Sequence, residues 1–250
     1  MSGHSHWAKI KRAKASTDAK RGRVWSKLAR RIIVAAKVGG GNPDENLSLR
    51  YAIDESKAAN MPNDTIRKAI LKGTGELGAA TYEEVLYEAY GPGGVAFMIE
   101  GLTDNRNRTA PEMRKILERY NGQLGSANCV AWMFEKKGVF SIDRQAAEED
   151  SLMELALAAG ADDVTVDEKM FEVVCHPAQF IAVKQALADK GIATISGEIA
   201  MIPKTTVAVA GDKARQVLKL MEMLEDHDDV QHVYANFEMP DEVLAEAERA

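Results

Sequence analysis

The chain has 250 residues, of which 46% are hydrophobic and 28% charged, and its formal net charge is −6. This length is sufficient for one to three domains with buried cores. No apolar run approaches the roughly 20 residues that a membrane helix needs. The only cysteines, Cys129 and Cys175, lie far apart, which favours a reducing compartment over a disulfide scaffold. We therefore expect a soluble, cytoplasmic protein with no membrane contact.

The first 37 residues carry a strongly uneven charge. They contain eleven lysines and arginines but only one acidic residue, Asp18, and so have a net charge of +10. Because the whole chain has a net charge of −6, the remaining residues must sum to −16. A basic arm on an acidic body indicates a partner with negative charge.

Three short helices are predicted in the first third of the chain. From Asp18 onwards, apolar and basic residues recur with a helical period on two different arcs. Three consecutive glycines end this helix. Asn42 and Pro43 then resemble the cap and first position of a second helix, which we expect to run to about Asn60. A third helix spans residues 65–72, so the three helices form a small bundle.

The glycines of residues 73–78 form the pattern G-x-G-x-x-G, which also occurs in dinucleotide-binding folds. Here the pattern follows a helix rather than a strand, and Glu76 stands where a pyrophosphate would bind. We therefore interpret residues 73–78 as a linker.

Beyond this linker the apolar pattern alternates between strands and helices. The turn-like sequence of residues 90–94 separates two strands that we expect to pair antiparallel. Thr109 and Glu112 have the spacing of a capping box for the helix that follows, and Gly122 ends it. The other expected elements are strands at residues 82–89, 95–102, 130–134, 138–142, 171–175, 194–202, 206–210 and 230–237, and helices at 148–159, 177–190 and 212–225.

This order of elements favours the α+β class, with an N-terminal three-helix domain and two small α/β domains of split βαβ, ferredoxin-like type. The last unit is expected to complete the sheet that begins at Tyr82, so that one α/β domain is inserted into the other. The expected domains are residues 1–74 (basic arm and helical bundle), 75–133 plus 205–240 (discontinuous α/β domain) and 134–204 (inserted α/β domain), followed by a C-terminal tail at 241–250.

Several motifs occur in order along nearly the whole chain. They include Gly3-His4-Ser5, Asp18-Ala19-Lys20-Arg21-Gly22, Tyr90-Gly91-Pro92-Gly93-Gly94 and Asp104-Asn105-Arg106-Asn107-Arg108-Thr109. At this spacing they resemble the YebC/PmpR family. Its bacterial members are catalogued as transcriptional regulators, and its mitochondrial member as a translational activator of a cytochrome c oxidase subunit. The resemblance implies three domains, with the middle one interrupted by the third.

The basic side chains of the N-terminal region are candidates for nucleic-acid contact. The simpler alternative is a solvated helix face, but that does not explain so uneven a charge in an acidic chain. If about six of these groups meet phosphates, the logarithm of the binding constant should fall against log salt with a slope near −5 for duplex DNA. The candidates are Lys9, Lys11, Arg12, Lys14, Lys20, Arg21, Arg23, Lys27, Arg30 and Arg31.

A second candidate site is the loop that holds Asn105, Arg106, Asn107 and Arg108. It precedes a helix, whose free N–H groups and dipole favour an anion. The two arginines and two asparagines have donors for phosphates or base edges. The alternative is a structural loop in which the arginines pair with acidic residues of the same domain.

Enzymatic and metal-binding signatures are lacking in the sequence. There is no P-loop, no His-Glu-x-x-His motif and no histidine or cysteine pair at zinc spacing. A free Ser2-Gly3-His4 terminus would carry donors suited to Cu(II) or Ni(II), as any chain with histidine at this place would. We therefore expect no catalysis, no cofactor and no metal site.

We interpret the chain as a non-enzymatic, nucleic-acid-binding regulator of transcription that binds DNA through its basic N-terminal region. Two alternatives remain open. The resemblance also allows a ribosome-associated translation factor that binds ribosomal RNA or tRNA and eases translation of difficult, proline-rich sequences. The third possibility is a protein-interaction scaffold that uses the acidic body as its working surface.

Overall fold

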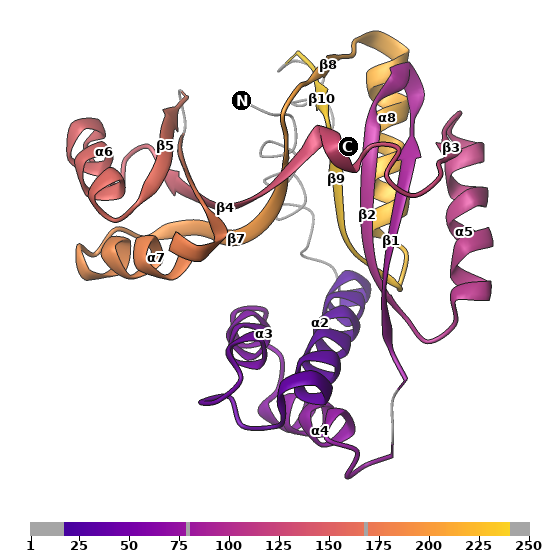
Figure 1. The fold of residues 1–250 in the computed structure, drawn as a ribbon, viewed down its shortest axis with the longest axis horizontal. Coiled ribbons are helices and arrows are strands. Elements are labelled where there is room, and N and C mark those ends of the chain that lie inside the picture. The colour runs from indigo at the N-terminus through magenta and orange to yellow at the C-terminus, as the bar shows by residue number, and fades with distance from the viewer. Residues whose placement is uncertain (1–17, 79–80, 168–169, 241–250) are drawn as a thin grey trace.

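The protein combines a helical bundle with two four-stranded sheets that carry helices (Figure 1). The computed structural model describes residues 18–78, 81–167 and 170–240, with side chains from residue 22 onwards. The predicted α+β class is confirmed. In the described part of the chain, no helix has both the length and the apolar character needed to cross a membrane.

The bundle consists of α2 (Asp18–Gly39), α3 (Leu47–Ala58) and α4 (Asn63–Gly73). The apolar arc of α2 faces the other two helices, and the indole N–H of Trp25 donates a hydrogen bond to the Ala59 carbonyl over 2.9 Å. The buried core of the bundle comprises Leu28, Ile32, Ile33, Ala36, Leu49, Ala52, Ile53, Met61, Ile66 and Ala69.

The second helix begins later than predicted. Residues 43–45 form a turn, and the cap of α3 is Asn46 rather than Asn42. The Asn46 side chain accepts a hydrogen bond from the Leu49 N–H and donates to the carbonyls of Ala35 and Gly40. The helix start is thus fixed by contacts with α2, which the local sequence pattern does not contain.

The first sheet has the strand order β3-β1-β2-β9. β1 (Glu83–Tyr90) pairs antiparallel with β2 (Ala96–Thr103), as predicted, and β2 pairs antiparallel with β9 (Val230–Ala235). The short strand β3 (Gln123–Leu124) lies beside β1. Helices α5 (Arg106–Arg119) and α8 (Gly211–Glu225) cover one face, where side chains such as Phe97, Met113 and Leu220 are buried together (Figure 1).

The helix after β2 also begins at a different residue from the predicted one. Asn105 caps α5 through a hydrogen bond from the Arg108 N–H to its side chain, whereas Thr109 lies inside the helix. The predicted capping box of Thr109 and Glu112 is therefore wrong. The Thr109 hydroxyl is instead within hydrogen-bond distance of Thr103 and Asp229, two residues of the candidate site.

The second sheet has the order β5-β6-β4-β7, and its neighbouring strands are antiparallel. Its elements follow the chain as β-α-β-β-α-β, the split βαβ arrangement predicted from the sequence. They are β4 (Phe134–Asp143), α6 (Glu149–Ala158), β5 (Ala161–Val166), β6 (Met170–Cys175), α7 (Phe180–Asp189) and β7 (Thr194–Pro203).

Several strands differ from their prediction, and the two-residue strand β3 was not predicted at all. β5 was not predicted, and residues 131–133 form a 3-10 turn, η2, before β4 rather than part of a strand. The carboxylate of Glu88 accepts hydrogen bonds from the N–H groups of Val130 and Ala131, which are then unavailable for strand pairing. β8 (Val207–Ala208) pairs in parallel with β10 (Phe237–Glu238) and stays outside the first sheet.

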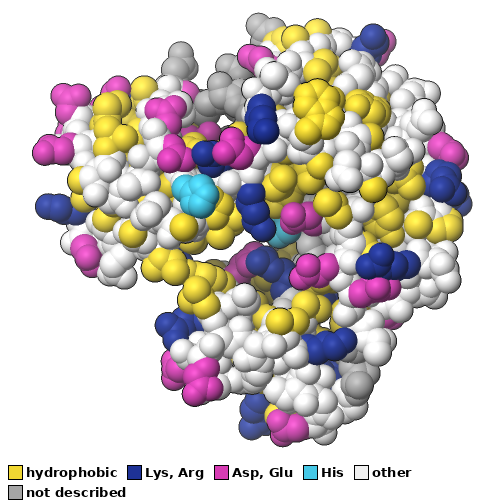
Figure 2. Space-filling view, in the orientation of Figure 1, with side chains coloured by type: hydrophobic (Ala, Val, Ile, Leu, Met, Phe, Trp, Pro, Cys, Tyr) yellow, Lys and Arg dark blue, Asp and Glu magenta, His cyan; other side chains and the backbone are white. Residues whose placement is uncertain are grey.

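The second sheet is formed entirely by residues that lie in the chain between β3 and β9 of the first sheet. This order supports the domain boundaries given above, which stay a prediction. Figure 2 shows the three parts around a hollow in which basic and acidic side chains meet. The candidate site lies where the bundle contacts the first sheet.

Candidate nucleic-acid interface

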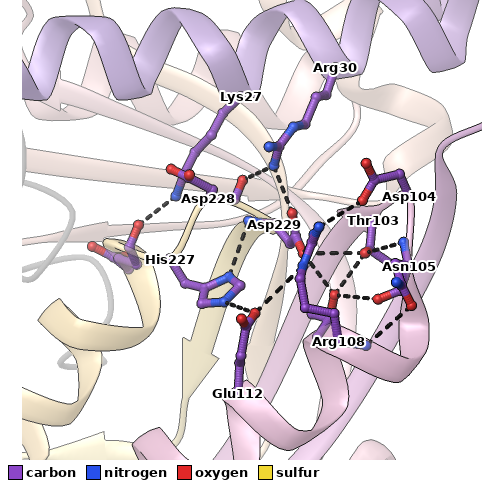
Figure 3. Close-up of polar contacts among 12 residues, drawn as sticks. Lys27, Arg30, Thr103, Asp104, Asn105, Arg108, Glu112, His227, Asp228 and Asp229 are labelled. Atoms are coloured by element: carbon purple, nitrogen blue, oxygen red, sulfur yellow. Dashed lines mark hydrogen bonds and ion pairs between the residues drawn. The ribbon is translucent and has the colours of Figure 1, made fainter. Parts of the chain in front are cut away.

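One side of α2 faces the turn between α8 and β9. This acidic turn, residues 225–229, has the sequence Glu-Asp-His-Asp-Asp. The helical period of α2 brings Arg23, Lys27 and Arg30 onto the same side, one turn apart. Their side chains reach toward the acidic turn from the helix above it (Figure 3 shows Lys27 and Arg30).

Each of these three side chains contacts the acidic turn. Arg23 Nη1 lies 3.2 Å from Asp226 Oδ2, and Lys27 Nζ donates to the Glu225 carbonyl oxygen over 2.5 Å. Arg30 Nη1 donates to the Asp228 carbonyl and to Asp229 Oδ1, the latter over 3.0 Å. These contacts join residues about 200 positions apart in the chain, and they fasten the bundle to the first sheet.

Arg30 is held from a second direction as well. Its guanidinium carbon lies 5.5 Å from the ring centroid of Tyr82, a distance at which a cation is attracted by the aromatic face. Only 15% of the Arg30 side chain is exposed, against 40% of the Arg23 side chain. Arg23, Lys27 and Arg30 form the basic row of α2. Its inner end, at Arg30, is therefore fixed, and its outer end, at Arg23, is open to solvent.

Asp229 is the centre of the polar network. Its side chain is 2% exposed, and Oδ2 accepts hydrogen bonds from Arg108 Nη2 over 2.5 Å and from the hydroxyls of Thr109 (2.7 Å) and Thr103 (3.2 Å). Burial by itself would raise the pKa of Asp229. The hydrogen bonds from Thr109 and Arg108 and the charges of Arg108 and Arg30 outweigh it and lower this pKa below its usual value. Asp229 is thus a buried carboxylate between two arginines.

His227 completes the lining of the crevice. Its Nδ1 accepts a hydrogen bond from the Asp229 N–H over 3.1 Å, so the proton lies on Nε2, which is 3.0 Å from Glu112 Oε2. The crevice has a volume of about 530 Å³. It is lined by Arg23, Arg30, Arg108, Glu112, Asp226, His227, Asp228 and Asp229. Among the described residues, no three or more His, Cys, Asp or Glu side chains are arranged so that they could hold a metal ion.

The four residues of the second candidate site have different surroundings. Asn105 caps α5, and Asn107 is exposed. Arg106 Nε lies 2.7 Å from Glu83 and its guanidinium also donates to the Glu84 carbonyl. Arg108 pairs with Asp229 and also with Asp104 and Glu112 at either side, and its hydrogen bond to Asp229 together with these charges raises its pKa. The arginines therefore pair with acidic residues of the first sheet and its helices, the alternative considered above.

The structure thus brings two of the predicted basic residues, Arg23 and Arg30, into one polar crevice with Arg108, and Lys27 contacts the same acidic turn at the Glu225 carbonyl. Arg31 instead pairs with Glu55 of α3 over 2.5 Å. Lys20 and Arg21 belong to the first turn of α2, but their side chains lie outside the described residues, as do Lys9, Lys11, Arg12 and Lys14. Nucleic-acid contact by all of these residues stays a prediction.

The sequence reasoning missed the acidic turn as the partner of α2. The uneven charge of the first 37 residues predicted a partner with negative charge, because this segment contains hardly any acidic residues of its own. The turn supplies them from the far end of the chain. The one available signal was the run Asp228-Asp229 directly before an apolar strand, because a carboxylate that is buried with such a strand needs hydrogen-bond partners.

Two protein-family models match separate parts of the chain, one over the helical bundle and one over the two sheets. Residues 5–76 match the model described as "TACO1/YebC protein N-terminal domain", and residues 82–237 match "TACO1/YebC second and third domain". A "Probable transcriptional regulatory protein" of Pelotomaculum thermopropionicum is 54% identical over 243 residues, which cover 96% of this chain and 100% of the relative. A protein of the same name from Dictyoglomus turgidum is 53% identical, with 98% of each chain covered.

A solved structure is similar as well. The crystal structure of a conserved hypothetical protein from Aquifex aeolicus superposes with a TM-score of 0.82 at 44% sequence identity. The match covers 91% of this chain and 94% of that one. The arrangement of the bundle and the two sheets is therefore shared with an experimentally determined fold.

Proposed function

Because this chain belongs to the TACO1/YebC family, we propose that it is a regulatory protein that binds nucleic acid through its basic N-terminal region and acts by binding rather than by catalysis. The observation that carries this proposal is the net charge of +10 on the first 37 residues of a chain whose net charge is −6. Attraction to phosphates supplies nearly all of the affinity when a protein binds nucleic acid independently of its sequence. The acidic remainder keeps the other faces of the molecule away from the polymer.

The first candidate target is duplex DNA, with transcription as the regulated process. It agrees with the name that the bacterial relatives carry. In this case the protein acts in the cytoplasm, and the basic row of α2, together with residues 9–14, lies along the phosphate backbone.

The second candidate target is irregular RNA, such as ribosomal RNA or tRNA, with translation as the regulated process. One observation favours it. Helix-based DNA readers insert an exposed helix into the major groove, where its side chains contact base edges. Arg23, Lys27 and Arg30 of α2 instead face the acidic turn, so this side of α2 is not presented for base readout. RNA that is recognised by shape and backbone suits such a surface.

A competition experiment separates the two targets. Labelled duplex DNA is bound to the purified protein and challenged with intact ribosomes and with unrelated DNA, between about 50 and about 200 mM salt. Displacement by ribosomes at low concentration, persisting at the higher salt, supports the RNA target. A promoter duplex that resists both competitors supports the DNA target.

A charge-reversal variant tests the proposed region itself. Lys9, Lys11, Arg12 and Lys14 are changed together to Glu, and the matched control changes four exposed lysines elsewhere, Lys115, Lys190, Lys204 and Lys213. Both variants have the same net charge. We expect only the first to lose binding and its salt dependence. Equal affinities for the two variants would contradict binding through the N-terminal region.

A further inference from the structure

The contacts between α2 and the acidic turn fall into an inner and an outer part. The inner part is Asp229, which is buried and bonded to Arg30, Arg108 and two threonines. In the outer part, Arg23 pairs with Asp226, and the two side chains are 40% and 44% exposed. Asp228 is also exposed and lines the same crevice. The inner part anchors the helix, and the outer part lies at the solvent surface.

The outer part has the features of a short polyanion. α8 ends at Glu225, and the carbonyl groups of its last turn carry partial negative charge. Lys27 donates to one of these carbonyl groups, that of Glu225. The carboxylates of Asp226 and Asp228 add two full charges at the same place. The turn thus presents to α2 the type of group that a phosphate backbone would present.

Exposed ion pairs of this kind contribute little free energy. Water screens them, and fixing two long side chains costs entropy, so an exposed pair changes an equilibrium by less than about tenfold. Duplex DNA, by contrast, carries about one negative charge per 1.7 Å of its axis. A phosphate backbone can therefore replace Asp226 at Arg23, whereas the buried contact between Arg30 and Asp229 stays closed.

We propose that residues 225–228 act as an internal competitor that covers the outer basic residues of α2 in the free protein and is displaced when a nucleic-acid backbone binds. This proposal rests on the proposed function, because it concerns the regulation of the same basic surface. The turn lowers the affinity for any polyanion, independent of sequence, so that only a dense phosphate backbone gains access to Arg23 and Lys27. The Asp229 anchor keeps α2 in place during the exchange.

The test compares two double variants with the same change in net charge. Asp226→Asn with Asp228→Asn removes the carboxylates of the outer turn. The control, Asp189→Asn with Asp212→Asn, removes two exposed carboxylates elsewhere. Asp212 lies in the first turn of α8, at the opposite end of the helix from residues 225–228. Affinities for a short duplex DNA and for a single-stranded RNA of the same length are measured with the full chain at several salt concentrations.

We expect the turn variant to bind both probes about three- to tenfold more tightly than the wild type, because it loses the exposed Arg23–Asp226 ion pair and a second carboxylate that lines the crevice. The control should stay within about twofold of the wild type, because charges beyond one Debye length, about 10 Å, are screened. An equal gain in affinity in both variants would contradict the proposal that the turn competes with nucleic acid. No gain in affinity in the turn variant, while the wild type binds, would contradict it as well. If no protein, variant or wild type, binds either probe, the proposed function itself falls.

Discussion

The guanidinium of Arg30 lies 3.0 Å from the carboxylate of Asp229, across 199 positions of sequence and at the boundary between the helical bundle and the first sheet. Asp229 also binds Arg108 of α5. One carboxylate therefore ties two segments of the chain to the strand that follows it. Because this carboxylate is buried, its neutralisation should have consequences for both stability and domain arrangement.

Asp229→Asn should lower the free energy of unfolding by about 3 kcal/mol, because removing one partner of a buried ion pair leaves the other charge without compensation. Urea denaturation followed by circular dichroism measures the loss. The control is Asp228→Asn, which removes the neighbouring exposed carboxylate and should change stability by less than about 0.5 kcal/mol. Similar losses in both variants would mean that the network around Asp229 contributes little.

The same residue should make the stability of the wild type depend on pH. The pKa of Asp229 is lowered in the folded protein, where hydrogen bonds and arginine charges outweigh burial. A carboxylate with a lowered folded pKa stabilises the protein above its unfolded pKa, about 3.9, and this contribution is lost as the pH falls through the folded pKa. The stability difference between wild type and Asp229→Asn should therefore be full near pH 7 and shrink below about pH 4. Urea denaturation at a series of pH values checks this; a constant difference would contradict it.

How far the fold could be predicted depends on the range of the interactions. The apolar periods of α2, α8 and the β1–β2 pair are local, and they predicted these elements correctly. The predicted start of α3 was wrong because Asn46 is selected as the cap by its additional bonds to the Ala35 and Gly40 carbonyls. The predicted start of α5 was wrong because Thr109 bonds to Asp229, while Asn105 makes the local cap bond. Residues that bond outside their own segment carry no local signature.

The same limit applies to the candidate site. The helical period of the sequence predicted that the basic residues of α2 lie on a side of the helix separate from its apolar side. In the sequence, Asp229 is recognisable only as an acidic residue directly before the strand that begins at Val230. Its burial and its contact with Arg30 depend on how the bundle packs on the first sheet. A pairing over such a distance follows from topology and not from spacing.

Glu88 gives a prediction for the first sheet. It is 6% exposed, and its carboxylate accepts hydrogen bonds from the N–H groups of Asn128 (2.6 Å), Val130 (2.7 Å) and Ala131 (2.8 Å). Although burial raises the pKa of Glu88, these three bonds outweigh it and lower the pKa. Glu88→Ala should cost about 3 kcal/mol, because each of the three bonds to the charged group contributes about 1 kcal/mol.

The Glu88 variants are compared by urea denaturation and by limited proteolysis of residues 125–133. Glu88→Gln keeps one acceptor oxygen and should lose less stability than Glu88→Ala. The control Glu84→Ala alters an exposed residue of the same strand and should leave stability and cleavage nearly unchanged. Faster cleavage in Glu88→Ala but not in the control indicates that the carboxylate holds this loop.

Two glycines of the bundle should respond to alanine in opposite directions. A Cβ at Gly73 would lie 2.5 Å from the Ile33 carbonyl oxygen and 2.6 Å from Ala36 Cβ, so Gly73→Ala forces α4 away from α2 and should cost about 1 to 3 kcal/mol. Gly22 of α2 is exposed, and a Cβ at this position would meet no atom beyond its own stretch of helix within 4 Å, so Gly22→Ala should stabilise the helix by up to about 1 kcal/mol. Thermal unfolding of both variants checks the signs; a loss in both would show that packing at Gly22 is tighter than its surroundings indicate.

Arg106 and Arg108 lie two positions apart at the start of α5 but should differ in their effect. The Arg108 guanidinium bonds to the buried Asp229, so Arg108→Ala should cost about 2 to 3 kcal/mol. Arg106 pairs with Glu83, and these side chains are 58% and 48% exposed, so Arg106→Ala should change stability by less than about 1 kcal/mol. Urea denaturation tests this difference. Because Arg106→Ala should stay folded, its affinity for duplex DNA and RNA tests the start of α5 as a binding site. An unchanged affinity and salt slope assign Arg106 to structure, and a slope reduced by about one assigns it to phosphate contact.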